Sequence, residues 1–248
     1  MHKLLIAIAF FAIGVFLVSS VVTAAPSPKA TAPISAFAEE VFVDYAAPSH
    51  AGPGPHPTTE SSDFQLTQGG IKWPNGATVK YAVSTAGCSD DCADAVNQID
   101  LSFDAWELGV LTFTRNDGSP GINPCTGSAN SVSFLPVDGA GGALAFASVC
   151  RNVASKEIVG FRIVYDSAET WSDSGDAAKL DIRNTGTHEA GHVAGLGHDN
   201  PPRSGCLTMY KFAGLGETQK RTLGLGDKLG MDALYSTGDI TSGPGCGL

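Results

Sequence analysis

Residues 188–198 read His-Glu-Ala-Gly-His-Val-Ala-Gly-Leu-Gly-His, a spacing of three histidines that suits a single zinc ion. On a helix, His188 and His192 are four residues apart, so their rings project from the same face. A straight helix cannot bring His198 to that face, but Gly195 can take a positive φ, end the helix and turn the chain back. Three imidazoles leave one coordination position of Zn²⁺ open. We therefore predict one catalytic zinc ion held by His188, His192 and His198.

Glu189 follows the first of these histidines and is placed to lie over the ion rather than to bind it. A carboxylate in that position can act as the general base of a hydrolytic reaction. Two plainer interpretations remain open: a helix with surface histidines, and a closed structural metal site. A closed site would normally add a fourth protein ligand instead of a glutamate beside the first one.

Together with a later methionine, this stretch resembles the signature of the metzincin clan of metallopeptidases, a long zinc motif followed by a methionine-bearing turn. Met209 lies eleven residues past His198, in Cys-Leu-Thr-Met-Tyr at residues 206–210. Taken alone, it would be an ordinary core methionine. The astacin-like and serralysin-like branches carry a tyrosine two residues after the methionine, where this chain has Lys211. The resemblance therefore points to the matrixins, the catalytic domains of matrix metalloproteinases and their microbial relatives.

Apolar periodicity and this resemblance together predict an α+β domain with the zincin (metzincin) fold. We expect a twisted mixed β-sheet of about five strands, an active-site helix, a long N-terminal helix and a C-terminal helix. Alternating or β-branched residues predict strands at residues 77–83, 111–114, 131–135, 143–148 and 159–165. Helical spacing predicts helices at residues 90–108, 180–195 and 227–235, with Asn184 or Thr185 as the cap of the second.

The N-terminal region has the composition of a targeting segment followed by a linker. Residues 1–24 combine Lys3, an uncharged apolar run and small residues at the end, as in a signal peptide. The apolar run is long enough that an uncleaved membrane anchor is the alternative. Residues 25–62 are rich in Pro, Ala and Ser and predict a linker or a short pro-segment, in which His50 and His56 could mask the zinc. Residues 63–248 then form the metallopeptidase domain.

Composition agrees with one exported catalytic domain. The chain has 248 residues, of which 43% are hydrophobic, and a net charge of −10 without a basic cluster. This argues against nucleic-acid binding, and we expect a monomer that acts on protein or peptide substrates. The six cysteines suggest disulfides and allow fifteen pairings. Chain order favours Cys88–Cys92, Cys125–Cys150 and Cys206–Cys246.

The resemblance also implies a calcium site around a glycine-rich turn. By the match, its ligands are the side chains of Asp138, Asp166 and Glu169 and the carbonyls of Gly139, Gly141 and Ala143. Carboxylates with backbone oxygens suit a hard cation, although an ordinary polar turn with solvated acids is the alternative. The positions of the second, structural zinc of vertebrate-type matrixins hold Ser131, Ser133, Phe146 and Val164, so we expect no second zinc.

The function implied is that of a secreted zinc-dependent endopeptidase with Glu189 as general base. An extended substrate would pair with an edge strand made of Leu144, Ala145, Phe146 and Ala147, and would contact Tyr210. Gly195 and Met209 would have structural roles. Two other functions stay open: a non-catalytic zinc-bearing extracellular binding or adhesion module, and a zinc hydrolase acting on a non-protein substrate.

Overall fold

The computed structural model describes residues 36–46, 61–67, 69–126, 130–199 and 207–238, all within one compact unit, Ser35–Leu248. Several expectations lie outside these residues: the signal segment 1–24, the histidines at positions 50 and 56, and the Cys206–Cys246 disulfide. Within the described part of the chain, no helix is long and apolar enough to span a membrane.

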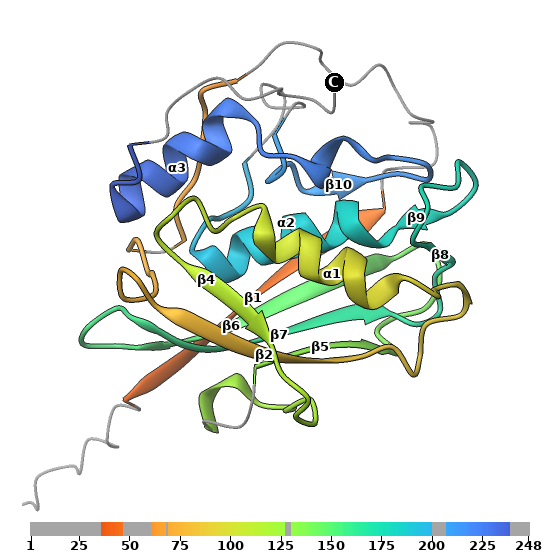
Figure 1. The fold of residues 1–248 in the computed structure, drawn as a ribbon, viewed down its shortest axis with the longest axis horizontal. Coiled ribbons are helices and arrows are strands. Elements are labelled where there is room, and N and C mark those ends of the chain that lie inside the picture. The colour runs from red at the N-terminus through yellow and green to blue at the C-terminus, as the bar shows by residue number, and fades with distance from the viewer. Residues whose placement is uncertain (1–35, 47–60, 68, 127–129, 200–206, 239–248) are drawn as a thin grey trace, which may run out of the picture. The chain divides into compact units, whose positions relative to one another are not determined.

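A mixed sheet of seven strands, in the order β10-β1-β6-β7-β5-β2-β4, forms the framework of the unit (Figure 1). β6 runs antiparallel to both of its neighbours, and the other four adjacent pairs are parallel. The strands are β1 Phe37–Ala46, β2 Thr78–Ser84, β4 Thr112–Arg115, β5 Asn130–Leu135, β6 Ala143–Asn152, β7 Ile158–Asp166 and β10 Phe212–Ala213. The α+β class is confirmed, and the five predicted strands correspond to β2, β4, β5, β6 and β7.

β1 is the main departure from the predicted fold. Residues 37–46 were expected to belong to a linker or pro-segment, yet they form a ten-residue strand. This strand pairs with β6 from Phe37↔Asn152 to Tyr45↔Ala143. The interpretation of a linker without regular structure is therefore wrong for this stretch, whereas a pro-segment remains compatible with it.

Within the described residues, three helices accompany the sheet: α1 Ala95–Asp104, α2 Ile182–Ala194 and α3 Leu225–Tyr235. The predicted N-terminal helix at 90–108 was too long. Its first residues form the short strand β3, Asp90–Asp91, and Asp90 has a φ of 72°, outside the helical region. β3 belongs to a small parallel sheet with β8 Trp171–Ser172 and β9 Leu180–Asp181. Short 3₁₀ turns at Pro124–Thr126 and Gln219–Arg221 complete the set.

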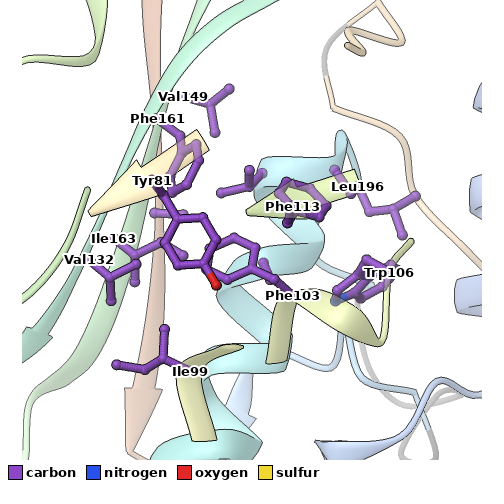
Figure 2. Packing of buried hydrophobic residues seen from close by; sticks show 14 of the residues in the cluster. Tyr81, Ile99, Phe103, Trp106, Phe113, Val132, Val149, Phe161, Ile163 and Leu196 are labelled. Carbon is purple, nitrogen blue, oxygen red and sulfur yellow. The ribbon is translucent and has the colours of Figure 1, made fainter. Parts of the chain in front are cut away.

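Aromatic rings join α1 to the sheet and form the core (Figure 2). The Phe103 ring lies 4.3 Å from the Tyr81 ring and 5.5 Å from the Phe161 ring, measured between centroids. Trp106 is fully buried, and its indole N–H donates to the carbonyl of Thr187 on α2 at 2.7 Å. Burying one such side chain contributes about 1.5–3 kcal/mol, so this cluster fixes α1 against α2 and against the sheet.

Two disulfides lie within the described residues, Cys88–Cys92 and Cys125–Cys150. Both pairings were predicted and are confirmed. The first closes the turn before α1, and the second ties β6 to the 3₁₀ turn that precedes β5.

Candidate metal centre

Different capping interactions end α2 at its N-terminus and at its C-terminus. At the N-terminus the side chain of Asp181 accepts a hydrogen bond from the N–H of Asn184, so the cap is Asp181 and neither of the predicted residues. At the C-terminus Gly195 has a φ of 108°, and its N–H bonds back to the carbonyls of Gly191 and His192. A residue with a Cβ is strained in that conformation. The chain therefore leaves the helix at Gly195 and returns toward the histidine face.

The three histidines of the motif converge. The distances between their Nε2 atoms are 3.2 Å for His188–His192, 3.1 Å for His192–His198 and 3.1 Å for His188–His198. An ion about 2.0–2.1 Å from each nitrogen, the usual Zn–N distance, fits such a triangle.

Backbone carbonyls decide which ring nitrogens face the centre of this triangle. Nδ1 of His188 lies 2.7 Å from the Thr208 carbonyl, and Nδ1 of His192 lies 2.8 Å from the Leu196 carbonyl. A carbonyl oxygen only accepts, so these Nδ1 atoms carry the proton and the Nε2 atoms present lone pairs. Converging lone pairs repel one another unless a cation lies between them. The donor set therefore fits a metal ion, as the sequence predicts.

Burial keeps the three rings neutral. Desolvation, reinforced by neighbouring positive charge, lowers the pKa of His188 and His192 well below the ordinary value. Burial and the charges of Lys220 and Lys211 lower the pKa of His198 from 6.5 to about 4. Neutral imidazole is the form that binds a metal.

These lowered pKa values predict that the protein keeps zinc in mildly acidic solution. Protons displace a metal only when the pH approaches the pKa of the free ligand, which is about 4 for His198 instead of 6.5. Because the pKa of His198 is 6.5 in the unfolded chain and about 4 in the fold, the unfolded chain binds more protons than the folded chain between these pH values. The free energy of unfolding is therefore highest above pH 6.5 and decreases as the pH falls toward 4. We expect metal analysis after dialysis to find close to one zinc per chain down to about pH 5. Loss of half the zinc at pH 6.5 would contradict this expectation.

Glu189 lies beside the triad, as its place in the motif suggests. It is fully buried, and its carboxylate, the ring of His188 and the carboxylate of Asp44 have ligand atoms within 4.8 Å of one another. Burial and the charge of Asp44 raise the pKa of Glu189 well above its ordinary value, while the charge of Lys220 opposes this. A metal cation nearby would likewise favour the ionised form.

Met209 packs directly beneath α2. A Cβ built on Gly191 would come within 2.2 Å of the Met209 sulfur and 2.6 Å of the Trp106 ring. The turn and the helix can approach this closely because residue 191 is glycine.

Asp227, on α3, holds the turn that carries Met209, and the sequence analysis missed it. Its carboxylate accepts hydrogen bonds from the backbone N–H groups of Thr208 at 2.8 Å, Met209 at 3.2 Å and Gly224 at 2.8 Å. Burial raises the pKa of Asp227 to about 6, although these N–H groups oppose the rise. The Thr208 carbonyl accepts in turn from Nδ1 of His188, so Asp227 supports this histidine through the turn. An acid in the first turn of a helix is the one signal that could have drawn attention to it.

Lys220 is a second residue that the sequence analysis missed. Its side chain is fully buried, and its ammonium donates to the Phe212 carbonyl at 2.8 Å and lies 3.9 Å from a carboxylate oxygen of Glu217. It supplies positive charge next to the triad and Glu189. A lone lysine in the sequence carries no signal of this kind.

The residues expected at a calcium site meet around the glycine-rich turn, but backbone N–H groups surround their carboxylates. Asp166 accepts from Val137, Asp138, Gly139 and Ala168. Glu169 accepts from Gly141, and Asp138 accepts from Ala143. Burial tends to raise the pKa of Asp166, yet these donors lower it overall. The structure thus brings the three acids to one turn, where backbone N–H groups donate to each of them.

The residues expected to bind substrate lie on β6, which is not an edge strand. β1 covers its free side, with Phe42↔Ala147, Val43↔Phe146 and Asp44↔Ala145 as partners. Tyr210, the other expected contact, pairs with Asp199 across an isolated bridge and lies 5.8 Å from the Phe212 ring. The segment that covers β6 therefore belongs to this same chain.

Comparison with known proteins agrees with the geometry. A family model described as Matrixin matches residues 72–236. Karilysin of Tannerella forsythia is 28% identical over 76% of this chain and 38% of its own length. Matrilysin of Homo sapiens is 33% identical over 40% of this chain and 34% of its own length. Metalloendoproteinase 1 of Glycine max is 29% identical over 58% of this chain and 47% of its own length. The matched region thus spans less than half of each of these relatives.

Proposed function

The chain belongs to the matrixin family of metallopeptidases, and from this membership we propose that it is a zinc-dependent endopeptidase that cleaves extended protein substrates. The observation that carries the proposal is the convergence of three histidine Nε2 atoms within 3.1–3.2 Å of one another, with the Glu189 carboxylate beside them. Three protein ligands and a neighbouring acid are typical of catalytic zinc sites, in which one coordination position stays open.

In this proposal each side chain has a separate task. A zinc ion held by His188, His192 and His198 would supply a Lewis acid that polarises a substrate carbonyl. The carbonyls of Thr208 and Leu196 keep the rings of His188 and His192 oriented toward the ion. Glu189 takes the proton of the attacking water and returns it to the leaving amine.

The substrate would lie along β6. An extended peptide can add to a strand through main-chain hydrogen bonds, and Leu144, Ala145, Phe146 and Ala147 offer this strand next to the metal ligands. The pairing of β1 with β6 supports this placement of the substrate, because β1 lies along β6 in the way an extended peptide would. We propose Tyr210 as a further contact, since its backbone forms a bridge with Asp199, the residue after His198.

Metal removal tests the proposed activity. We expect the full-length chain, loaded with zinc, to digest casein, and 1,10-phenanthroline to reduce the digestion to background because the metal is essential. Added Zn²⁺ should restore it. The digestion is followed over many hours, since β1 lies across the site. A chain that binds zinc but cleaves neither casein nor a peptide library would instead fit the non-catalytic binding module.

We also propose that the protein is exported. The signal-like residues 1–24 and the two disulfides favour an oxidising compartment outside the cytoplasm. N-terminal sequencing of protein from culture medium should then begin after the signal segment, near Ala25. Recovery of the intact N-terminus in a membrane fraction would favour the anchor.

Calcium remains a proposal that rests on the acids gathered at the turn of Asp138, Asp166 and Glu169. A cation there would have to replace backbone N–H groups that now bond to these carboxylates. Calcium at about 100 times its Kd would stabilise the fold by about 2.7 kcal/mol. Equal melting temperatures in calcium and in EGTA would contradict the proposed calcium site.

A further inference from the structure

β10, Phe212–Ala213, is an edge strand of the large sheet and only two residues long. It is separated from β6 only by β1, so a peptide that lies along β6 in that position has β10 on its other side. The Lys211 carbonyl, just before β10, faces this position, because it accepts from the N–H of Tyr45 at 3.3 Å. A strand of two residues forms few ladder bonds, so its placement depends on contacts outside the ladder.

Two charged side chains hold the far edge of β10. Carbonyls of successive residues in a strand point to opposite edges, so the Phe212 carbonyl points away from the substrate position. This carbonyl accepts a hydrogen bond from the Lys220 ammonium at 2.8 Å. The N–H of Gly214, which follows β10, donates to Oε2 of Glu217 at 3.0 Å. Lys220 and Glu217 therefore bond to the backbone of β10 and of the residue after it.

These two residues form a buried ion pair that is tied to α2. Nζ of Lys220 lies 3.9 Å from Oε1 of Glu217, and both side chains are almost completely buried. Asn184, in the first turn of α2, donates to the same Glu217 oxygen at 3.3 Å and accepts from the N–H of Lys220 at 2.8 Å. His188 lies four residues after Asn184, on the same face of the helix. The helix that carries two of the histidines thus also carries the anchor of β10.

A buried ion pair is a costly way to fill space, because both charges lose their hydration. Apolar side chains of similar volume would fill the same space without that cost. They would not set a direction, whereas Lys220 and Glu217 each bond to one specific backbone group. Hydrogen bonds of ionised groups are short and strong, and they fix geometry. The pair is therefore suited to set the place of β10 relative to α2.

The substrate residues that reach β10 are those after the cleaved bond. β1 shows how an extended chain runs in this position. The carboxylate of Asp44 lies near His188, and the next two residues, Tyr45 and Ala46, pair with β10. A peptide that runs in the same direction places the residues that follow its cleaved bond beside β10.

We propose that Lys220, Glu217 and Asn184 are positioning residues for the substrate. They hold β10 at a set distance from the histidine triad, so that a peptide fits between β6 and β10 with its carbonyl at the metal centre. The proposal rests on the proposed function, because it needs a substrate along β6. The three residues act through β10, so their loss affects substrate residues that reach β10 and leaves metal binding unchanged.

The test removes both charges at once, by Glu217→Leu with Lys220→Met in the full-length, zinc-loaded chain. Loss of one partner alone would leave a buried charge unpaired. The matched control is Asp100→Asn with Arg115→Met. It removes an ion pair of 3.0 Å at β4, the opposite edge of the sheet, and asparagine keeps an acceptor for the Tyr81 hydroxyl.

Two peptides with the same residues before the cleaved bond serve as substrates. One continues for about three residues after that bond, enough to reach β10, and the other for a single residue. Each protein preparation is measured on both peptides. The ratio of the two kcat/KM values does not depend on how much of the preparation is active. Hydrogen exchange at residues 212–214 and the zinc content are measured in parallel.

We expect the parent to prefer the longer peptide. The double variant should lose about tenfold in kcat/KM on that peptide, mainly through a higher KM, and stay within about twofold on the shorter one. Amide exchange at residues 212–214 should become about tenfold faster, because Gly214 loses its acceptor. Zinc content should stay at the parent level, and the control should match the parent throughout.

The outcomes separate this inference from the proposed function. Equal losses on both peptides, or no loss on either, would refute the role of the pair in placing the substrate. If the parent binds zinc but cleaves neither peptide, the proposed function itself fails, and unchanged exchange in the double variant would show that the pair does not hold β10 either. Asn184→Ala is a second variant that releases the pair from α2 and should shift the ratio in the same direction. Thermal unfolding shows which variants keep the fold.

Discussion

Glu189→Gln is expected to abolish peptide-bond hydrolysis while the chain still binds zinc. Glutamine has nearly the same shape as glutamate but cannot take a proton from the attacking water, and removal of a general base costs about 10²–10⁴-fold in rate. Glu189 is fully buried beside His188, and no other carboxylate of the described residues lies in that group except Asp44. The measurement is kcat/KM on a peptide substrate, together with the zinc content.

The variant and the parent are measured side by side in the full-length, zinc-loaded chain. Glu107→Gln is the control, because Glu107 accepts a hydrogen bond from the N–H of Phe113 at 2.8 Å, away from the triad. Turnover by Glu189→Gln within about threefold of the control would remove Glu189 from the role of general base. Loss of zinc from this variant would point to a structural role instead.

The convergence of the three histidines could be predicted from the sequence because their geometry is local. His188 and His192 are one helical turn apart, and a glycine between them and His198 allows the chain to reverse. The five sheet strands between residues 78 and 166 were predicted for a similar reason. Their apolar alternation is contained in short segments and needs no knowledge of their partners.

The residues that the sequence did not reveal act through distant partners. Asp44 approaches His188 and Glu189, more than 140 positions away in the chain. β1 itself is flanked by Pro- and Ala-rich stretches, which suggested a linker, and its partner β6 was expected to bind a substrate. Neither charge nor periodicity identifies the occupant of a cleft before the cleft is known.

The residues expected to bind calcium illustrate the opposite difficulty. The resemblance pointed to the turn around Asp138, and the three expected acids do gather there. However, a sequence does not reveal whether carbonyl oxygens or N–H groups of the turn point at the carboxylates. In the structure, N–H groups bond to Asp138, Asp166 and Glu169, so the cation preference of the turn depends on backbone orientation.

Asp227→Ala is expected to have the largest effect on stability. The substitution leaves three buried N–H groups, those of Thr208, Met209 and Gly224, without an acceptor. Each such group costs about 1–3 kcal/mol, and removal of a buried carboxylate offsets part of this sum. We expect the free energy of unfolding to fall by about 2–4 kcal/mol, measured by urea denaturation of the zinc-loaded chain. Because the turn also holds His188 through the Thr208 carbonyl, zinc affinity should fall about 10- to 100-fold.

The pH dependence of this loss distinguishes Asp227 from a residue that merely fills space. Its pKa is raised from 3.8 to about 6 in the fold. Its contribution is therefore complete below pH 4 and decreases as the pH rises through 6. The difference in unfolding free energy between parent and Asp227→Ala should be larger at pH 4 than at pH 7. Asp232→Ala, on the same helix, removes an acceptor for the N–H of Gly238 and should cost about 1 kcal/mol. A pH-independent loss, or an equal loss in both variants, would mean that Asp227 does not hold the turn that contacts His188.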